Sequence, residues 1–162
     1  MRIFEKIFKE FNKTKIKYLV VGGVAVNLYG YARFTGDLDI LLLLDKKNLE
    51  KMDKIMKKLN YCERLPVTIM ALQDHEQVRK WLKEKNMTAY SFSPPPYNPL
   101  MIDVLMEESL RFEKVYGKKV VKKINGINIP VIGIDDLIRM KKKAGRAEDL
   151  LDLKKLLKLK GL

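Results

Sequence analysis

The chain has 162 residues, of which 47% are hydrophobic and 33% charged, a composition typical of a globular domain with its own core. Its longest uninterrupted apolar run, Ile40–Leu44, is too short to cross a bilayer, and its first residues lack the apolar segment of a signal peptide. The single cysteine, Cys62, excludes an internal disulfide, so a cytoplasmic protein with no membrane partner is expected.

The formal net charge is +13, and the positive excess is uneven. Residues 111–162 hold 15 Lys and Arg against 6 Asp and Glu. A basic surface favours a polyanionic partner such as RNA. The alternative is that the lysines only form the polar faces of surface helices. The sequence leaves both interpretations open.

The first elements lead to a glycine turn. Apolar residues at helical spacing predict a helix over residues 2–12, and a strand is expected over Tyr18–Val21. Gly22-Gly23 ends that strand, and a short helix is expected from Val24 to Tyr29. Two glycines allow a ligand to approach the backbone closely, and the start of a helix offers free N–H groups to an anion. We therefore expect a phosphate at this turn.

Two carboxylates follow the turn. Asp37 and Asp39 open a predicted strand that continues to Leu44, and residues two apart on a strand point to the same face. Their like charges repel, whereas a divalent cation between them would attract both. Phosphate and metal together predict a site for a metal–nucleotide complex. Arg33 and Thr35 come just before Asp37, and each can be a loop residue with no role. Alternatively, Arg33 binds a triphosphate, because a guanidinium can form two hydrogen bonds to phosphate.

A third carboxylate, Asp103, interrupts a later apolar segment over residues 100–106. Either an arginine or backbone N–H groups satisfy it, or it faces Asp37 and Asp39 from a neighbouring strand as a third acidic ligand. The intervening segments are less regular. They predict a helix over residues 45–59, a strand over 61–65, a helix or strand over 67–72, a helix over 74–85 and a weak strand over 87–92. A proline-rich loop is expected over 93–99, either as a plain surface loop or at the rim of the site.

The last third predicts a helix over residues 109–116 with Ser109 as its N-cap, and then a hairpin. Asn125-Gly126 separates its strands, 118–124 and 127–132. Two helices follow, divided at Gly145, and Leu150, Leu153, Leu156 and Leu157 are expected in the core. Asp149 and Asp152 lie three residues apart, on one face of the second helix. The whole pattern predicts a single α+β domain, with a sheet core over 1–133 and C-terminal helices over 134–162.

Taken in order, Val21-Gly22-Gly23, Asp37-Leu38-Asp39 and Asp103 resemble the motif of the DNA polymerase β-like nucleotidyltransferase superfamily. The tail, with Lys141, Gly145-Arg146, Asp149 and Asp152, is similar to that of AbiEii-type nucleotidyltransferases. These are the toxins of bacterial toxin–antitoxin pairs and their stand-alone relatives. The resemblance implies a nucleotidyltransferase fold, a mixed twisted sheet flanked by helices, and an antitoxin protein as a partner.

The resemblance also implies a role for each residue. Asp37, Asp39 and Asp103 would hold two Mg²⁺ ions, and Gly22 and Gly23 would admit the β- and γ-phosphates of an NTP. Lys141 and Arg146 would be cationic partners of nucleotide or acceptor, with Lys141 part of the catalytic set. Asp149 would orient Lys141 or Arg146.

Three functional hypotheses follow. The first is an Mg²⁺-dependent enzyme that moves NMP from NTP to a hydroxyl acceptor such as RNA or tRNA. The second is the same chemistry on a protein or a small molecule such as an antibiotic. The third is a non-catalytic nucleotide- or RNA-binding module, against which three converging carboxylates argue.

Overall fold

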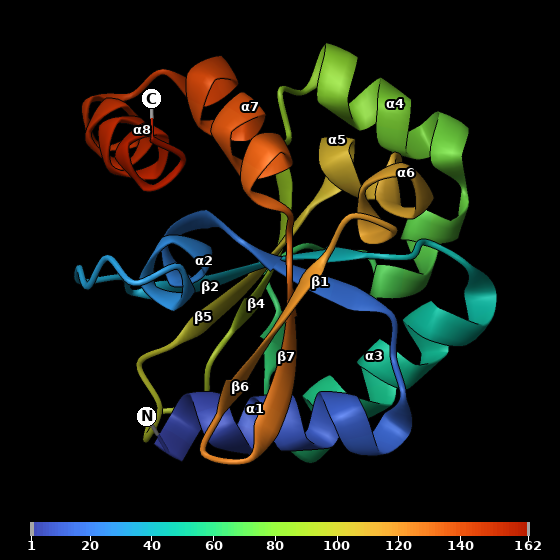
Figure 1. Cartoon of the computed structure of the whole chain (residues 1–162). Coiled ribbons are helices and arrows are strands. Elements are labelled where there is room, and N and C mark those ends of the chain that lie inside the picture. The colour runs from blue at the N-terminus through green and yellow to red at the C-terminus, as the bar shows by residue number, and fades with distance from the viewer. Residues whose placement is uncertain (1, 162) are drawn as a thin grey trace.

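One mixed sheet of seven strands runs through the molecule, with α1 and α3 on one side of it and α7 and α8 on the opposite side (Figure 1). The computed structural model describes residues 2–161. The sheet has the strand order β3-β4-β5-β2-β1-β7-β6. Its strands are β1 (Tyr18–Val21), β2 (Asp37–Leu42), β3 (Cys62–Glu63), β4 (Ala89–Ser93), β5 (Met101–Leu105), β6 (Val120–Ile124) and β7 (Ile127–Val131).

Eight α-helices and one 3₁₀ helix of the described part connect and cover the strands. They are α1 (Arg2–Thr14), α2 (Gly22–Leu28), α3 (Lys46–Lys58), η1 (Ile69–Gln73), α4 (His75–Glu84), α5 (Met106–Ser109), α6 (Phe112–Tyr116), α7 (Ile134–Ala144) and α8 (Ala147–Leu159). The predicted α+β class and mixed sheet are confirmed. Within residues 2–161, no helix has both the length and the apolarity needed to span a membrane.

The central strands of the sheet are buried. β1 is buried along its whole length, and β2 is buried except at its start, where Asp37 is exposed and Asp39 half-buried. β2 lies between β1 and β5, so its predicted interior position is confirmed. The predicted face of α3, residues Leu49, Met52, Ile55, Met56 and Leu59, is buried as well. The two acidic residues therefore stand where the apolar strand reaches the surface.

Residues with left-handed backbone angles form the turn between β6 and β7 and the boundary between α7 and α8. Asn125 and Gly126 have φ angles of 49° and 81°, the left-handed values of a type I′ hairpin turn. Gly145 ends α7 at φ 64°, which a side chain would disfavour. The predicted hairpin and the division between α7 and α8 are both confirmed.

Some boundaries differ from the predictions. α2 begins at Gly22 rather than Val24, residues 61–65 form only the two-residue β3, and residues 67–72 contribute to a 3₁₀ helix. The predicted helix over 109–116 is confirmed only for Phe112–Tyr116, which forms α6, because Ser109 belongs to the preceding helix α5. The Ser109 hydroxyl donates to the Leu105 carbonyl at 2.6 Å and accepts from the Leu42 N–H at 3.1 Å, so it joins α5 to β2 instead of capping α6.

Two surface predictions are wrong. Leu150 is 54% exposed, because the inward face of α8 is formed by Asp149, Asp152 and Leu156, and Leu150 is turned away from them. The proline-rich loop is not at the rim of the site. Its Asn98 side chain donates to the Tyr61 hydroxyl at 2.8 Å, which holds the loop beside the end of α3.

Candidate active site

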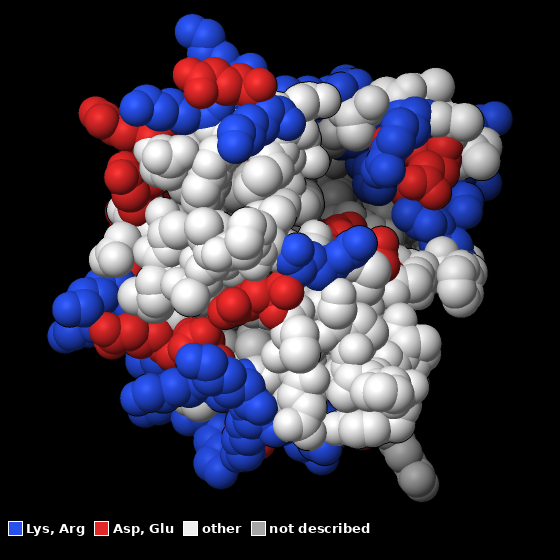
Figure 2. Space-filling view, turned by 180° about the vertical axis from the view of Figure 1, so that it is seen from behind, with Lys and Arg blue, Asp and Glu red and all other residues white. Residues whose placement is uncertain are grey.

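A cavity of about 770 Å³ opens between the glycine turn, β5 and the helices α7 and α8. Figure 2 shows the surface hollowed on this side of the molecule, with acidic atoms visible inside the hollow. All ten site residues predicted from the sequence line it: Gly22, Gly23, Arg33, Thr35, Asp37, Asp39, Asp103, Lys141, Arg146 and Asp149. Segments from the beginning, the middle and the end of the chain thus meet in one place.

The acidic side of the cavity is formed by β2 and β5. These strands are parallel neighbours, and Asp39 is the direct register partner of Asp103. Asp37 lies two residues earlier on β2, on the same face. Burial raises the pKa of Asp39 to about 7, and the negative charges of Asp103 and Asp37 contribute to this rise. Burial also raises the pKa of Asp103, against a hydrogen bond from Ser91 that lowers it.

The donor set fits a hard divalent cation, which prefers carboxylate oxygens. Oδ1 of Asp103 is buried and has no hydrogen-bond partner among the described residues. A cation would satisfy this oxygen and reverse the repulsion that raises the pKa of Asp39. Within residues 2–161, no three carboxylate, imidazole or thiol side chains are gathered closely enough to form a complete ion site as they stand.

The glycine turn is built against these carboxylates. Gly22 has a φ of +65°, and a Cβ at this position would lie 2.2 Å from Oδ2 of Asp39. At Gly23 a Cβ would lie 2.9 Å from Nη2 of Arg33 and 3.0 Å from Oγ1 of Thr35. Glycine is therefore required at the first position by both backbone and space. At the second position it allows Arg33 and Thr35 to approach the turn.

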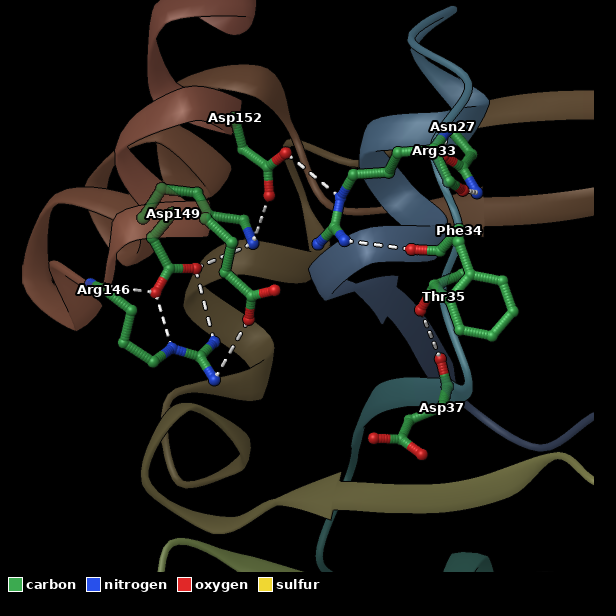
Figure 3. A network of polar contacts seen from close by, with 10 residues as sticks. Asn27, Arg33, Phe34, Thr35, Asp37, Arg146, Asp149 and Asp152 are labelled. Atoms are coloured by element: carbon green, nitrogen blue, oxygen red, sulfur yellow. Dashed lines mark hydrogen bonds and ion pairs between the residues drawn. The ribbon is translucent and has the colours of Figure 1, made fainter.

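The loop between α2 and β2 is held by its own polar groups (Figure 3). The Asn27 side chain accepts from the Arg33 N–H at 3.0 Å and donates to the Arg33 carbonyl at 3.1 Å. Nη1 of Arg33 donates to the Phe34 carbonyl at 3.1 Å, and the Thr35 hydroxyl donates to the Asp37 carbonyl at 3.1 Å. These contacts fix the chain that leads to Asp37.

The cationic side comes from α7 and α8. Lys141 is only 5% exposed, and its Nζ lies 3.0 Å from Oδ1 of Asp149 and 3.0 Å from Oδ2 of Asp152. Nε of Arg146 donates to Oδ2 of Asp149 at 2.7 Å. Burial alone would raise the pKa of Asp149, but hydrogen bonds from Arg146 and Lys141 lower it. Asp149 therefore contacts both of the cations that it was predicted to orient.

Sequence reasoning did not assign two residues of this region to the site. Asp152 contacts Arg33 as well as Lys141. The family resemblance includes Asp152 in the C-terminal motif but gives it no role, and its spacing of three from Asp149 places both residues on one face of the helix. Arg64 lies near enough to Asp103 for its positive charge to lower the pKa of that carboxyl. Arg64 follows the two-residue β3, and no motif in the sequence distinguishes it.

Comparison with solved structures identifies the fold. The lincosamide antibiotic adenylyltransferase LnuA, solved with lincomycin bound, matches 94% of this chain over 93% of its own length, at a TM-score of 0.62 and 16% identity. ANT(2″)-Ia in complex with adenylyl-2″-tobramycin matches 96% of this chain over 86% of its own, at a TM-score of 0.61 and 11% identity. A candidate nucleotidyltransferase from Thermotoga maritima matches 97% over 91%, at a TM-score of 0.58 and 17% identity.

The chain thus has the nucleotidyltransferase fold over nearly its full length. At these identities the likeness concerns the fold and does not assign a reaction. No protein-family model matches the sequence, and a search of curated proteins finds no match either. None of the three structures is described as an AbiEii-type protein, so that subgroup stays a prediction.

Proposed function

We propose that this protein is an Mg²⁺-dependent nucleotidyltransferase that moves NMP from an NTP to a hydroxyl acceptor. The observation that carries the proposal is the pairing of Asp39 with Asp103 across β2 and β5, directly against a turn that only glycine can form. Half-buried carboxylates that are register partners on neighbouring strands repel each other unless a cation lies between them. They are found here in the wall of a cavity, in a fold shared with adenylyltransferases.

In this proposal the acidic residues bind the metal ions and accept a proton. Asp37, Asp39 and Asp103 would hold two Mg²⁺ ions, which supply positive charge to the triphosphate and to the attacking oxygen. Asp103, which lies on the strand beside Asp39, would accept the proton of the acceptor hydroxyl. The hydroxyl oxygen then bonds to the α-phosphorus, and the bond from that phosphorus to the leaving pyrophosphate breaks.

The neighbouring residues would bind the rest of the nucleotide. Gly22 and Gly23 would let the β- and γ-phosphates approach the backbone, with Arg33 and Thr35 beside them. Arg146, whose side chain is 68% exposed, would contact nucleotide or acceptor. Lys141 is enclosed by Asp149 and Asp152, so its part would be to hold these two carboxylates in place.

The net charge of +13 supports RNA, including tRNA, as the acceptor. The test is incubation with each labelled NTP, Mg²⁺ and total RNA, for wild type and Asp39→Asn. We expect label in RNA with the wild type only. If the wild type binds NTP but transfers no label to RNA, the RNA acceptor is wrong.

A small-molecule or protein acceptor is the second candidate. Seven residues that line the cavity are acidic and four are basic, which suits an acceptor that carries amino groups. The similarity to LnuA and ANT(2″)-Ia, which are described with antibiotics, supports the same candidate. Labelled protein bands in a lysate, or a mass increase by one NMP on an aminoglycoside or lincosamide, would distinguish it from RNA transfer.

The AbiEii-like role, with an antitoxin protein as partner, is a separate part of the proposal. It predicts that expression of the chain alone arrests growth and that Asp39→Asn relieves the arrest. Equal growth with both chains would exclude a toxin. If Asp39→Asn also left every measurable activity unchanged, the chain would be a non-catalytic binding module.

A further inference from the structure

Asp152 joins two sides of the cavity. It lies on α8 and is 1% exposed. Each of its two carboxylate oxygens forms an ion pair with a different basic side chain. Its Oδ1 is 3.1 Å from Nε of Arg33, which belongs to the loop before β2, and its Oδ2 is 3.0 Å from Nζ of Lys141 on α7. Figure 3 shows this carboxylate between α8 and the loop. Among the described side chains, Arg33–Asp152 is the one ion pair that connects α8 to the segment carrying Asp37 and Asp39.

The contacts of Arg33 leave one nitrogen directed at the glycine turn. Asp152 holds Nε, and the Phe34 carbonyl accepts from Nη1. Nη2 lies 2.9 Å from the position that a Cβ of Gly23 would occupy, and no described residue accepts a hydrogen bond from it. A guanidinium is planar, so fixing two of its nitrogens fixes the direction of the third. Asp152 therefore orients Arg33 without occupying the nitrogen that faces the turn.

We infer that Asp152 is a positioning residue for a polyphosphate, because it aims the Arg33 guanidinium at an anion bound beside Gly22 and Gly23. This inference rests on the proposed function. A guanidinium already held in place loses less conformational entropy when it binds phosphate than a free side chain does. Asp152 would thus strengthen polyphosphate binding without touching the ligand.

The variant Asp152→Asn suits the test because it keeps the shape of the side chain. Lys141 retains its ion pair with Asp149 in this variant. The matched control is Asp135→Asn, which removes a carboxylate that pairs with Lys160 at the other end of the α7–α8 pair and does not line the cavity. The Asp135 side chain is 73% exposed, so this variant controls for the loss of one carboxylate from the α7–α8 pair, and a purely structural role of Asp152 is tested by a double-mutant cycle with Arg33.

The experiment measures binding of Mg²⁺ with inorganic tripolyphosphate by calorimetry, because this probe does not depend on which base the site prefers. We expect binding to weaken about tenfold in Asp152→Asn, since the buried ion pair that anchors Arg33 is lost, and to stay at the wild-type value in Asp135→Asn. Adenosine, which lacks phosphate, should bind all three proteins equally.

A double-mutant cycle with Arg33→Gln separates positioning from a direct charge effect. Because Asp152 acts through Arg33, adding Asp152→Asn to Arg33→Gln should weaken binding no further. Unchanged or tighter tripolyphosphate binding by Asp152→Asn, or additive losses in the double variant, would overturn the inference.

A third variant covers the case in which Asp152→Asn does not fold. Arg33→Lys keeps the charge on the partly exposed loop residue but has no second nitrogen to aim at the turn. It should also bind about tenfold more weakly, and wild-type affinity would refute the inference. If the wild type binds neither tripolyphosphate nor any NTP, the proposed function itself fails, and that result is distinct from a failure of the role of Asp152.

Discussion

Asp39 is the residue whose protonation depends most on its neighbours. Its ordinary pKa of 3.8 rises to about 7, because burial disfavours the charged form and because Asp103 and Asp37 add negative potential. The positive charges of Lys141 and Arg146 oppose this rise. Without a cation, the folded protein therefore takes up a proton at Asp39 that the unfolded chain would release.

This linkage predicts the stability of Asp39→Asn. The folded-state pKa is raised, so the folded chain binds more protons than the unfolded chain between about pH 4 and pH 7, and wild-type stability falls as pH rises through that range. Asparagine carries no charge to bury. Urea unfolding in the presence of a chelator should show the variant more stable than wild type at about pH 8, by on the order of 3 kcal/mol, with the gain vanishing near pH 4.

The control for this prediction is Asp53→Asn, which removes a carboxylate on α3 paired with the exposed Lys57. Its effect should be within about 1 kcal/mol at every pH. An Asp39→Asn protein that is less stable than wild type at about pH 8 would mean that the carboxylate is satisfied by the fold, which would remove the argument for a cation there.

For single residues, the sequence predicts which way a side chain points better than it predicts which residues surround that side chain. The two-residue period of a strand is enough to put Asp37 and Asp39 on one face. Register between β2 and β5 depends on contacts some sixty residues apart in the chain. The residues alone therefore left the approach of Asp103 to Asp37 and Asp39 as one of two alternatives, and the family resemblance favoured it. Lys141 was predicted to meet nucleotide or acceptor, but two buried aspartates enclose it.

At the scale of elements, α7 is attached to the sheet layer through the short helix α5. The two carboxylate oxygens of Glu108 accept from Nη1 and Nη2 of Arg139 at 3.0 and 2.8 Å. The hydrogen bonds from Arg139 lower the pKa of Glu108, although burial opposes them. The adjacent Glu107 pairs with Lys143 at 2.6 Å, but both of these side chains are more than half exposed. The short helix α5 thus carries a partly buried ion pair next to an exposed one.

We expect Glu108→Gln to lower the free energy of unfolding by roughly 1–3 kcal/mol, and Glu107→Gln to change it by less than about 1 kcal/mol. The folded-state pKa of Glu108 is lowered, so its stabilisation is complete above its unfolded value of 4.5 and is lost as pH falls through the lower folded value. Chemical unfolding at about pH 7 and pH 3 measures both effects. Equal losses for the two variants would show that this bidentate contact does not hold α7.

Elements were predictable where a single physical signal dominates. The long helices α1, α3 and α4 follow apolar periodicity, and the β6–β7 hairpin follows Asn125-Gly126. The short helices α5 and α6 were not separated, because one turn of helix contains too few residues to show a period. The face of α8 was predicted from its leucines, yet the ion pairs of Asp149 and Asp152 turn these two residues inward.

At the scale of the whole molecule, charge is divided between outside and inside. The chain carries a net charge of +13, while the cavity is lined by seven acidic and four basic residues. Bound Mg²⁺ would neutralise part of that acidic excess before a triphosphate enters. Outside the cavity, basic residues outnumber acidic ones, and this excess acts on any large molecule that approaches.

This distribution of charge predicts that acceptor affinity depends on salt concentration differently for an RNA and for a small molecule. Binding of an RNA acceptor displaces counterions from each neutralised phosphate, so its affinity should fall roughly tenfold or more between about 50 and 200 mM KCl. A small molecule that binds inside the cavity should change much less over the same range, because few counterions are released. The measurement is acceptor affinity against salt at saturating NTP, with NTP affinity recorded in parallel as the control. A shallow slope for RNA would assign the surface lysines to solvation alone and favour the small-molecule acceptor.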